Sequence, residues 1–513
     1  MVRSRSGSRP RWWVHALGVA CAVASIAWPA ASARAFCGFF VAGSDARLTN
    51  NASQVVLMRK GNRTVMTMSN NYQGPPESFA MVVPVPVILT KDDVRTLPAD
   101  VFDHVDSLSA PRLVEYWEQD PCQRVSYDTD DVLMSAVEEK EEVSAPRKHR
   151  DLGVKVEARF VTGEYEVVIL SATESSGLET WLRQNRYSIP AGAAAALAPY
   201  VRDRSKFFVA KVDIRKVRRD AHGVVQLSPL RFSYDANELR LPVRLGLLNA
   251  GGKQDLIIYV IHPSSRFEVA NYANAFIPTN LEVGDGVRTS FPAFYAELFD
   301  AVTEKTGKRV VVTEYAWQTT SCDPCPVPPL SLDDISTLGL DVLEGIGATP
   351  EAPPPIAPGT TKPGVSGRVV ASPSPPRYMG PQPSWVLTRL HTRYSPETLS
   401  EDLIFREVGA VVGGRGFGSV NDDMTATGTS GPNNFQARYI IRHYWTQPVA
   451  CENPRREIWG GPPGVSDGTP PVSPAKGLAT APRGTVSLAK EVHSPVPLLG
   501  LQGKAAPPRR PTK

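Results

Sequence analysis

The stretch Val154-Lys155-Val156-Glu157-Ala158-Arg159-Phe160 alternates apolar and charged side chains. This period of two is typical of a β-strand with one face buried and the other face in water. Thr162-Gly163 follows as a turn, and residues 165–170 are predicted as a second strand. The fold can be worked out in both directions from these two consecutive strands.

Strands and helices follow one another irregularly along residues 153–345, which we predict to be the central body. Ser176-Gly177-Leu178-Glu179 has the pattern of a capping box, in which a Ser oxygen and a Glu carboxylate satisfy backbone donors at the start of a helix. Runs of strands with interspersed helices, without regular βαβ units, indicate an α+β fold with a mixed or mostly antiparallel sheet. The predicted strands are 207–217, 239–248, 256–262 and 309–317, and the predicted helices begin near 178, 190 and 292.

The flanking segments are predicted either as parts of the same body or as attachments to it. Residues 36–127 form its β-rich N-terminal part, with a hairpin around Gly61 and a helix over 91–117. Pro84 and Pro86 lack backbone donors, which places their strand at an edge or leaves it unpaired. Residues 385–460 carry strands expected to complete the body. Three segments are expected to be disordered or solvated, because they are charged or Pro-rich: the loop 128–152, the linker 346–384 and the basic tail 461–513.

The first 35 residues have the order of a secretory signal peptide. Four arginines precede an apolar run over 12–28, and small residues lead to Ala33-Arg34-Ala35, which is an A-x-A cleavage pattern. The run is slightly short for a membrane span, and an uncleaved anchor is the alternative interpretation. The predicted location is therefore outside the cytoplasm, in the periplasm, the cell envelope or the extracellular space. No integral membrane span is expected after cleavage.

Cysteine usage fits an oxidising compartment. Cleavage would remove Cys21 and leave five cysteines, most of which should pair as disulfides: Cys37, Cys122, Cys322, Cys325 and Cys451. Because five is odd, one thiol should be free, reactive or intermolecular. Cys322-Asp323-Pro324-Cys325 has the C-x-x-C spacing of redox proteins, but the prolines that follow it oppose a helix there. A structural disulfide is the preferred interpretation. Redox activity and metal binding are the alternatives, although no second C-x-x-C supports a zinc site.

Few other residues form a motif with clear chemistry. Arg438, Arg442 and His443 lie in one predicted strand, and the two arginines share a face that could bind a carboxylate or phosphate. The competing interpretation is a solvated sheet face. Neither H-E-x-x-H nor G-x-S-x-G occurs, so we assign no catalytic residue, metal site or cofactor. A net charge of +4 over 513 residues gives no reason to expect nucleic acid as a partner.

Several separated motifs occur in one order along the chain. They are FCGFFV at 36–41, SFAMVVPVP at 78–86, YWEQDPC at 116–122, GLETWL at 177–182, CDPC at 322–325, NFQARYIIRH at 434–443 and WGGPP at 459–463. With these motifs the chain resembles the exported bacterial family catalogued as domain of unknown function twenty-three-thirty. The resemblance implies export and one composite domain. It implies no activity and no functional residues.

These observations favour a non-enzymatic envelope or secreted protein with a binding or structural role. Its basic tail is expected to contact anionic envelope polymers, a hypothesis that rests on the charge of the tail alone. Two alternatives come from other classes. One is a thiol–disulfide oxidoreductase that uses Cys322 and Cys325. The other is an extracytoplasmic hydrolase or carbohydrate-binding protein, for which no residue can be named.

Overall fold

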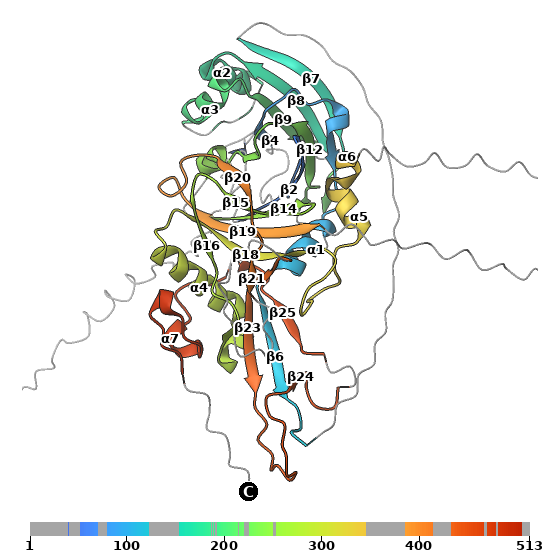
Figure 1. The fold of residues 1–513 in the computed structure, drawn as a ribbon. Helices are drawn as coiled ribbons and strands as arrows, with labels where there is room; N and C mark the ends of the chain where they lie inside the picture. Colours follow the sequence, from blue (N-terminus) through green and yellow to red (C-terminus); the bar gives the residue numbers. More distant parts are fainter. Residues whose placement is uncertain are drawn as a thin grey trace, which may run out of the picture. The chain divides into compact units, whose positions relative to one another are not determined.

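The α+β class predicted from the sequence is confirmed. Figure 1 shows several sheets with separate helices between them. The predicted signal peptide, charged loop and Pro-rich linker lie outside the described residues. The computed structural model of the chain describes residues 39–40, 52–69, 80–122, 153–185, 187, 189, 192–213, 215–219, 225–249, 253–344, 385–413, 432–465, 469–478 and 481–504.

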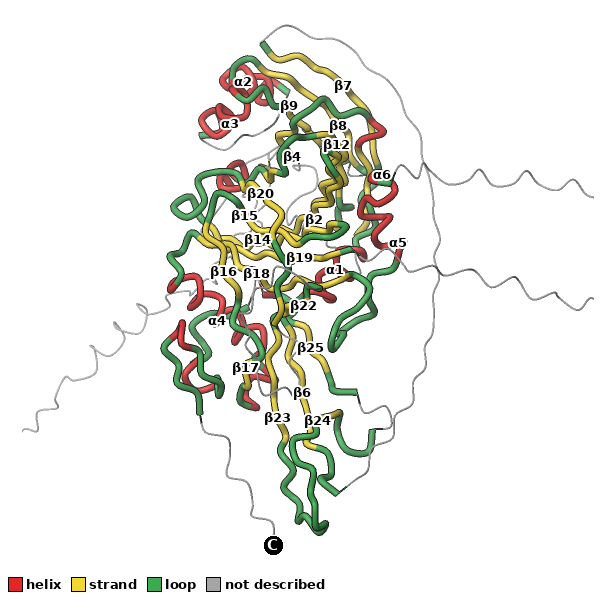
Figure 2. The backbone as a smooth tube through the Cα atoms, viewed as in Figure 1, coloured by secondary structure: helices red, strands yellow, loops and turns green. Residues whose placement is uncertain are grey.

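A mixed sheet carries the core of the described residues. Its innermost strand, β14, is buried along its whole length. Successive residues of this strand face two apolar clusters in alternation. It pairs with β19 antiparallel and with β2 parallel (Figure 2). In order across the sheet the strands are β21 (Val412–Gly413), β22 (Asn434–Gln436), β18 (Val310–Gln318), β19 (Val386–Tyr394), β14 (Gln254–His262), β2 (Ala52–Lys60), β3 (Arg63–Met68), β12 (Leu230–Asp235) and β5 (Val94–Thr96), with β16 (Ala273–Phe276) beside β18.

The predicted hairpin around Gly61 is confirmed. Strands β2 and β3 pair up to Lys60 and Arg63, which leaves a two-residue turn. Gly61 has a φ of +59° there, a conformation that glycine adopts without the steric cost of a side chain.

A second sheet packs over the central one. One of its faces is covered by the helices α2 (Ser175–Gln184) and α3 (Ala193–Arg202). The other face shares an apolar cluster with the central sheet, where the rings of Phe208 and Phe232 meet edge to face at 4.6 Å. The strands in order are β1 (Phe39–Phe40), β4 (Ala80–Val85), β9 (Lys206–Val212), β8 (Tyr165–Ala172) and β7 (Val154–Thr162). The strand pair from which the sequence argument began is therefore β7 and β8.

A third sheet is built around a parallel pair, β6 and β23, which lie far apart in the sequence. The long helix α4 (Phe291–Lys305) packs against this sheet in a separate apolar cluster. The strands are β17 (Leu281–Glu282), β23 (Arg438–His443), β6 (Arg112–Glu118) and β24 (Trp459–Gly460), with β25 (Val472–Pro474) also on β6. The smaller sheets are β13 (Arg240–Leu241) with β20 (Leu403–Val408) and β15 (Arg266–Val269), and β10 (Arg218–Arg219) with β11 (Val225–Gln226).

Short helices complete the described structure, and none of them is long and apolar enough to cross a membrane. The α-helices not yet given are α1 (Asp100–Ser109), α5 (Leu332–Ile335), α6 (Asp341–Leu343) and α7 (Leu488–Glu491). A π-helical turn over Ser336–Leu340 joins α5 to α6. The 3₁₀ turns are Lys91–Asp93, Arg244–Asn249, Asp285–Thr289 and Pro497–Leu499.

Two predicted elements differ from the structure, and prolines explain both differences. The helix expected over 91–117 is reduced to α1, with β5 before it and β6 after it. Pro98 and Pro111 bracket α1, and a proline neither continues a helix nor donates to one. The strand expected over 239–248 ends at Leu241 and is followed by a 3₁₀ turn, because Pro242 cannot donate to a ladder.

The expectation of a disordered tail over 461–513 is corrected for residues 469–478 and 481–504. Strand β25 pairs with β6, and four apolar side chains of the tail are buried in the cluster around α4: Ala475, Leu478, Val492 and Val496. A segment without a core of its own can still be ordered when its few apolar residues cover a surface that other elements supply. The Pro-rich and basic composition of the tail predicts disorder and does not reveal such packing against other elements.

Candidate functional site

The structure pairs four of the five cysteines expected after cleavage. Cys122 and Cys451 are joined across 329 residues, with their Cα atoms 5.7 Å apart. Cys322 and Cys325 form a second disulfide three residues apart. Cys37 lies outside the described residues.

The CDPC loop is docked on its neighbours as a structural element. Arg112 Nη1 donates to the Pro324 carbonyl at 2.9 Å, and the Gln436 amide donates to the Asp323 carbonyl. The helix that follows the loop, α5, begins only at Leu332. A redox C-x-x-C needs its first cysteine at a helix N-terminus, where the helix dipole favours the thiolate. The geometry of this loop does not provide that arrangement.

The structure does not bring Arg438, Arg442 and His443 together as one anion site. Arg438 is fully buried, and its Nε donates to Asn280 at 2.8 Å. Arg442 forms a 3.0 Å ion pair with Glu282. His443 contacts Glu115 at 2.9 Å, and its ring stacks on a tryptophan of β6 at 4.2 Å. Each of these side chains is engaged by its own neighbours within the third sheet.

A network of buried charges crosses the central sheet. Glu314 on β18 is fully buried and accepts hydrogen bonds at 2.6 Å from Arg389 and His391, both on β19. His391 also contacts Asp255 on β14 at 3.0 Å, and Arg389 contacts Asp106 on α1 at 2.6 Å. The network therefore joins three adjacent elements of the sheet to a helix. Although it is rich in carboxylates, no group of three or more metal-binding side chains occurs among the described residues.

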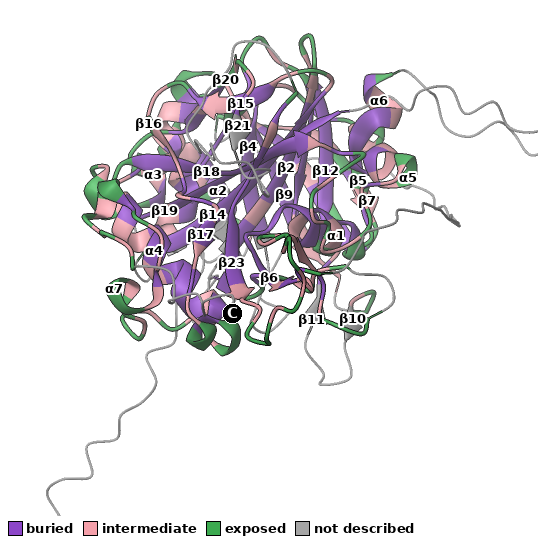
Figure 3. Cartoon of the chain, turned by 60° about the horizontal axis from the view of Figure 1, so that its bottom comes forward, coloured by how far each residue is buried: buried purple, intermediate pink, exposed green. Residues whose placement is uncertain are grey.

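The two central groups of this network are held in their charged forms. Burial alone would lower the pKa of His391, but Glu314 and Asp255 outweigh burial and raise that pKa to about 9. Burial would likewise raise the pKa of Glu314, but the cations of His391 and Arg389 outweigh burial and lower it to about 2. Every charge in the centre has a partner at hydrogen-bond distance, and the cluster is enclosed (Figure 3 shows the sheet's interior as buried). We interpret this network as structural.

The stability of the chain should fall at alkaline pH because of His391. Its pKa is raised from 6.5 to about 9, so its contribution is complete below pH 6.5 and is lost as the pH rises through 9. A shift of this size corresponds to about 3 kcal/mol at most. Glu314 works in the opposite direction, because its lowered pKa costs stability only as the pH falls below 4.5 toward 2. Urea unfolding midpoints measured at pH 5.5, 7.5 and 9.5 should decrease in that order. In the His391→Gln variant this decrease should disappear, and an unchanged slope in that variant would assign it to other groups.

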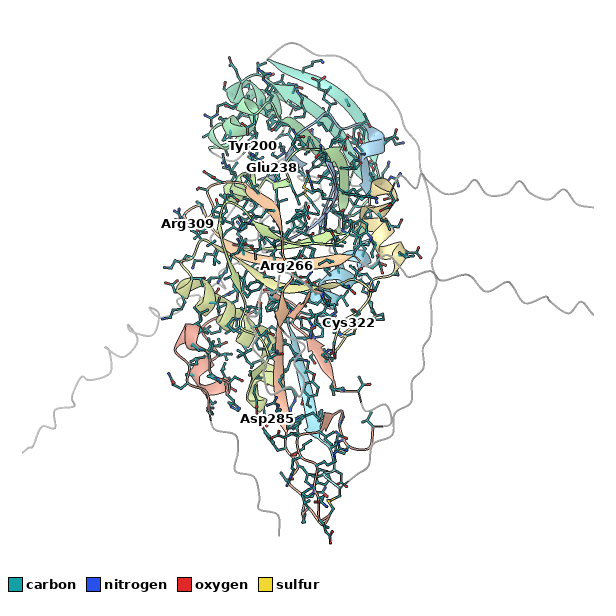
Figure 4. The ribbon with its side chains drawn as sticks, in the orientation of Figure 1. Tyr200, Glu238, Arg266, Asp285, Arg309 and Cys322 are labelled. Atoms are coloured by element: carbon teal, nitrogen blue, oxygen red, sulfur yellow. A yellow bond between two sulfur atoms is a disulfide. The ribbon has the colours of Figure 1, made fainter. Side chains whose placement is uncertain are left out.

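A cavity of about 500 Å³ opens between the second sheet and the end of β12, and we call it the tyrosine pocket. A volume in this range is typical of small-molecule sites. The wall is formed by chain segments far apart in sequence: Pro84, Val85 and Pro86 at the end of β4; Tyr200, Asp203 and Ser205 at the end of α3; Tyr234 in β12 and Ala236, Asn237 and Glu238 after it; Arg240 and Pro242 on and after β13; and Asp402 before β20. Figure 4 labels Tyr200 and Glu238 in this region.

The two tyrosines of the pocket differ in what their hydroxyl groups contact. The Tyr200 hydroxyl donates to Asp402 at 2.6 Å, and Asp402 also accepts the backbone amide of Val243 at 3.1 Å. This carboxylate is thereby committed to holding α3 against the segment that follows β13. Tyr234 as a whole is 5% exposed, and its hydroxyl remains accessible in the pocket without a hydrogen bond to any residue that the structure describes. Burial raises the pKa of Tyr234, so the hydroxyl keeps its proton.

Charged groups surround the mouth of the pocket. Arg240 pairs with Glu238 at 2.8 Å and with Asp203 at 3.7 Å, and all three side chains are about half exposed. Arg59 on β2 donates to the carbonyls of Ala236 and Asn237, which fixes the loop that carries Glu238. The mouth is therefore polar and preformed, with two carboxylates for one arginine.

The sequence interpretation assigned no role to any residue of this pocket. Pro84 and Pro86 entered only as an edge-strand signal, and the two tyrosines come from a helix and a strand that are not adjacent in sequence. A local signal is present in Arg202-Asp203-Arg204-Ser205-Lys206, where cationic side chains alternate with an acidic and a hydroxyl side chain. The chain turns here from the end of α3 into β9, and the structure places Asp203 and Ser205 on the tyrosine pocket and Arg202, Arg204 and Lys206 on a different hollow.

Comparison with known proteins gives a family and no activity. The family model described as an uncharacterized protein conserved in bacteria (DUF2330) matches residues 30–406. That range contains every residue of the tyrosine pocket and ends before β23. No curated protein and no solved structure matches the chain.

Proposed function

We propose that the chain is an exported, non-enzymatic binding protein. The premise is that it belongs to the family of uncharacterized bacterial proteins whose model matches residues 30–406. Its ligand site in this proposal is the tyrosine pocket. Export is supported by the signal-peptide pattern over 1–35 and by the two cysteine pairs at disulfide distance, which suit an oxidising compartment.

The observation that carries the proposal is the Tyr234 hydroxyl, which lies on the wall of a preformed cavity without a hydrogen bond to any described residue. A ligand that forms a hydrogen bond to this hydroxyl gains about 0.5–1.5 kcal/mol, the usual net value of one such bond. The carboxylates of Glu238 and Asp203 add acceptors at the mouth. The proline and tyrosine surfaces supply apolar contact. A small molecule with several hydroxyl groups, or with hydroxyl groups and an amine, matches this combination.

A binding role fits the pocket better than catalysis. A general base needs a carboxylate that is free to take a proton from a substrate. Asp402 is the buried carboxylate of the pocket, and its oxygen already accepts from Tyr200 and Val243. Burial raises the pKa of Asp402, and the bonds from Tyr200 and the backbone oppose this rise. The group acts as an anchor for α3.

Binding can be tested with D-glucosamine as the probe, by isothermal titration calorimetry of the purified mature protein. The hydroxyl groups and ammonium of this probe meet the acceptors of the pocket, and a Kd near the millimolar range is expected for a ligand of this size. Tyr234→Phe should weaken binding by about 3- to 10-fold, the usual value of one hydrogen bond. It should leave the unfolding midpoint unchanged, because the hydroxyl has no partner to lose.

Tyr200→Phe is the matched control, because it removes the same atom from the other tyrosine. This change should lower stability by about 1–2 kcal/mol, since Asp402 loses a hydrogen bond. D-glucose separates the contribution of hydroxyl groups from that of the ammonium. If neither sugar binds, or if Tyr234→Phe binds both as well as the wild type does, the tyrosine pocket is not a site for this ligand class.

A further inference from the structure

A second hollow lies beside the tyrosine pocket and has the opposite charge. It encloses about 470 Å³ and is lined by four cationic side chains, Lys155, Arg202, Arg204 and Lys206, with no carboxylate in its wall. The remaining lining residues are small or apolar: Gly153, Ser171, Ala172, Thr173 and Val201. We call this hollow the basic groove. No part of the proposed function above uses it.

The register of the second sheet places three of these residues in one row. Lys155 on β7 is directly opposite Ser171 on β8, and Ser171 is directly opposite Lys206 on β9. Opposite residues on adjacent strands point to the same face, with Cβ atoms about 5 Å apart, so the two lysines stand about 10 Å apart with a serine between them. Arg202 and Arg204 enter from the end of α3.

Most of the positive charge in the groove is not neutralised by the protein. Lys155 pairs with Glu157 at 2.7 Å, and Ser171 also donates to Glu157. The side chains of Arg202, Arg204 and Lys206 form no ion pair and no hydrogen bond with any residue that the structure describes. This contrasts with the arginines of the tyrosine pocket and the third sheet, which all contact carboxylates or carbonyls. Four cations and one adjacent carboxylate leave a net charge of +3.

We propose that the basic groove binds a phosphate-bearing ligand. Clustered guanidinium and ammonium groups bind phosphate through charge-assisted hydrogen bonds, and arginine can do so with two parallel bonds. The Thr173 hydroxyl at the same wall already donates to the Gly153 carbonyl at 3.3 Å, so the donors of the groove are its cationic groups. The groove is larger than one phosphate group, so the ligand carries further atoms, as a phosphate ester or a phospholipid headgroup does. In this proposal the folded body contacts anionic envelope components through the basic groove. The sequence analysis had assigned this contact to the C-terminal tail instead.

The test uses two charge-removing substitutions that keep the backbone relaxed. Arg204 has a φ of +57°, a conformation that asparagine tolerates better than most residues, so Arg204→Asn is combined with Arg202→Gln. The matched control is Arg183→Gln with Lys308→Asn. Arg183 lies in the last turn of α2 as Arg202 does in α3, and Lys308 has a φ of +64°. Both double variants lose the same net charge.

Binding of glycerol 3-phosphate is measured by calorimetry, and binding to vesicles of phosphatidylglycerol by co-sedimentation, both at constant ionic strength. The Arg202/Arg204 variant should bind at least one of these probes 10-fold or more weakly than wild type, and the control variant should bind within 2-fold of wild type. Binding of the soluble ester alone identifies a small phosphorylated molecule as the ligand source, and binding of vesicles alone identifies a lipid headgroup. Equal losses of affinity in both double variants would mean that binding depends only on net charge, and this result would overturn the proposal. Absence of binding by the wild type would overturn it as well.

Discussion

Replacing Glu314 by glutamine should lower the free energy of unfolding by about 3–5 kcal/mol, the usual cost of leaving a buried ionic partner uncompensated. Glu314 is fully buried and is bonded at 2.6 Å to both Arg389 and His391. The amide keeps the shape of the side chain but removes the negative charge that both cations require. Urea unfolding followed by tryptophan fluorescence gives the change, provided that the slope with denaturant stays constant.

A double-mutant cycle separates this pair from the rest of the network. His391→Gln alone should also be costly, because it leaves Glu314 with one cation fewer. The double variant should lose clearly less free energy of unfolding than the two single variants together. Each substitution removes the charge with which the other residue forms its ion pair. Glu304→Gln is the surface control: its ion pair with Lys308 is more than half exposed on both sides, and its loss should cost less than about 0.5 kcal/mol. A loss below about 1 kcal/mol for Glu314→Gln would mean that the network contributes little.

The regular strands were predictable because they carry local signals. The alternation over 154–160 and the glycine turn after Lys60 depend only on neighbouring residues, and β7 and the β2–β3 hairpin are present as expected. Helix α4 is present for the same reason, because its apolar residues recur at helical spacing. The α+β class follows from the order of such elements. None of these inferences required knowledge of distant contacts.

Elements that depend on distant partners were not predictable in the same way. Strand β6 was assigned to a helix, but its partner β23 lies more than 300 residues later and stabilises it as a parallel strand. The tail was assigned to disorder, yet Arg483 contacts Asp255 and Asp300 at 3.4 and 2.6 Å. A basic residue whose carboxylate partners are remote in sequence looks unpaired until the fold is known. The charge of Arg483, counted toward an external partner in the sequence analysis, is therefore paired within the fold.

The two candidate sites show the same limit at the level of side chains. Tyr200 and Asp402 meet across 202 residues, and nothing near either residue signals the contact. By contrast, Arg202, Arg204 and Lys206 are close in sequence and alternate with Asp203 and Ser205. The sequence analysis drew nothing from this pattern, and only the structure shows that one set of side chains lines the tyrosine pocket and the other set lines the basic groove.

The second large effect is expected from the disulfide between Cys122 and Cys451. It closes 329 residues of chain, whereas the disulfide between Cys322 and Cys325 closes only three. A disulfide stabilises mainly by restricting the unfolded chain, and the effect grows with the logarithm of the loop length. Cys122→Ser with Cys451→Ser should therefore lower the free energy of unfolding by about 4–5 kcal/mol, and Cys322→Ser with Cys325→Ser by about 2 kcal/mol.

The comparison between the two pairs is more informative than either value alone. Both double variants replace two sulfur atoms by two hydroxyl groups, so the change in chemistry is the same and the loop length differs. The larger loss should appear in urea unfolding of the long-loop variant, and full reduction of wild type, which breaks both disulfides, should produce a loss near the sum of the two. Equal losses in the two variants would indicate that the unfolded chain is compact enough to cancel the entropy of the long loop. A larger loss in the short-loop variant would show instead that the CDPC loop, through its contacts with Arg112 and Gln436, organises the structure around it.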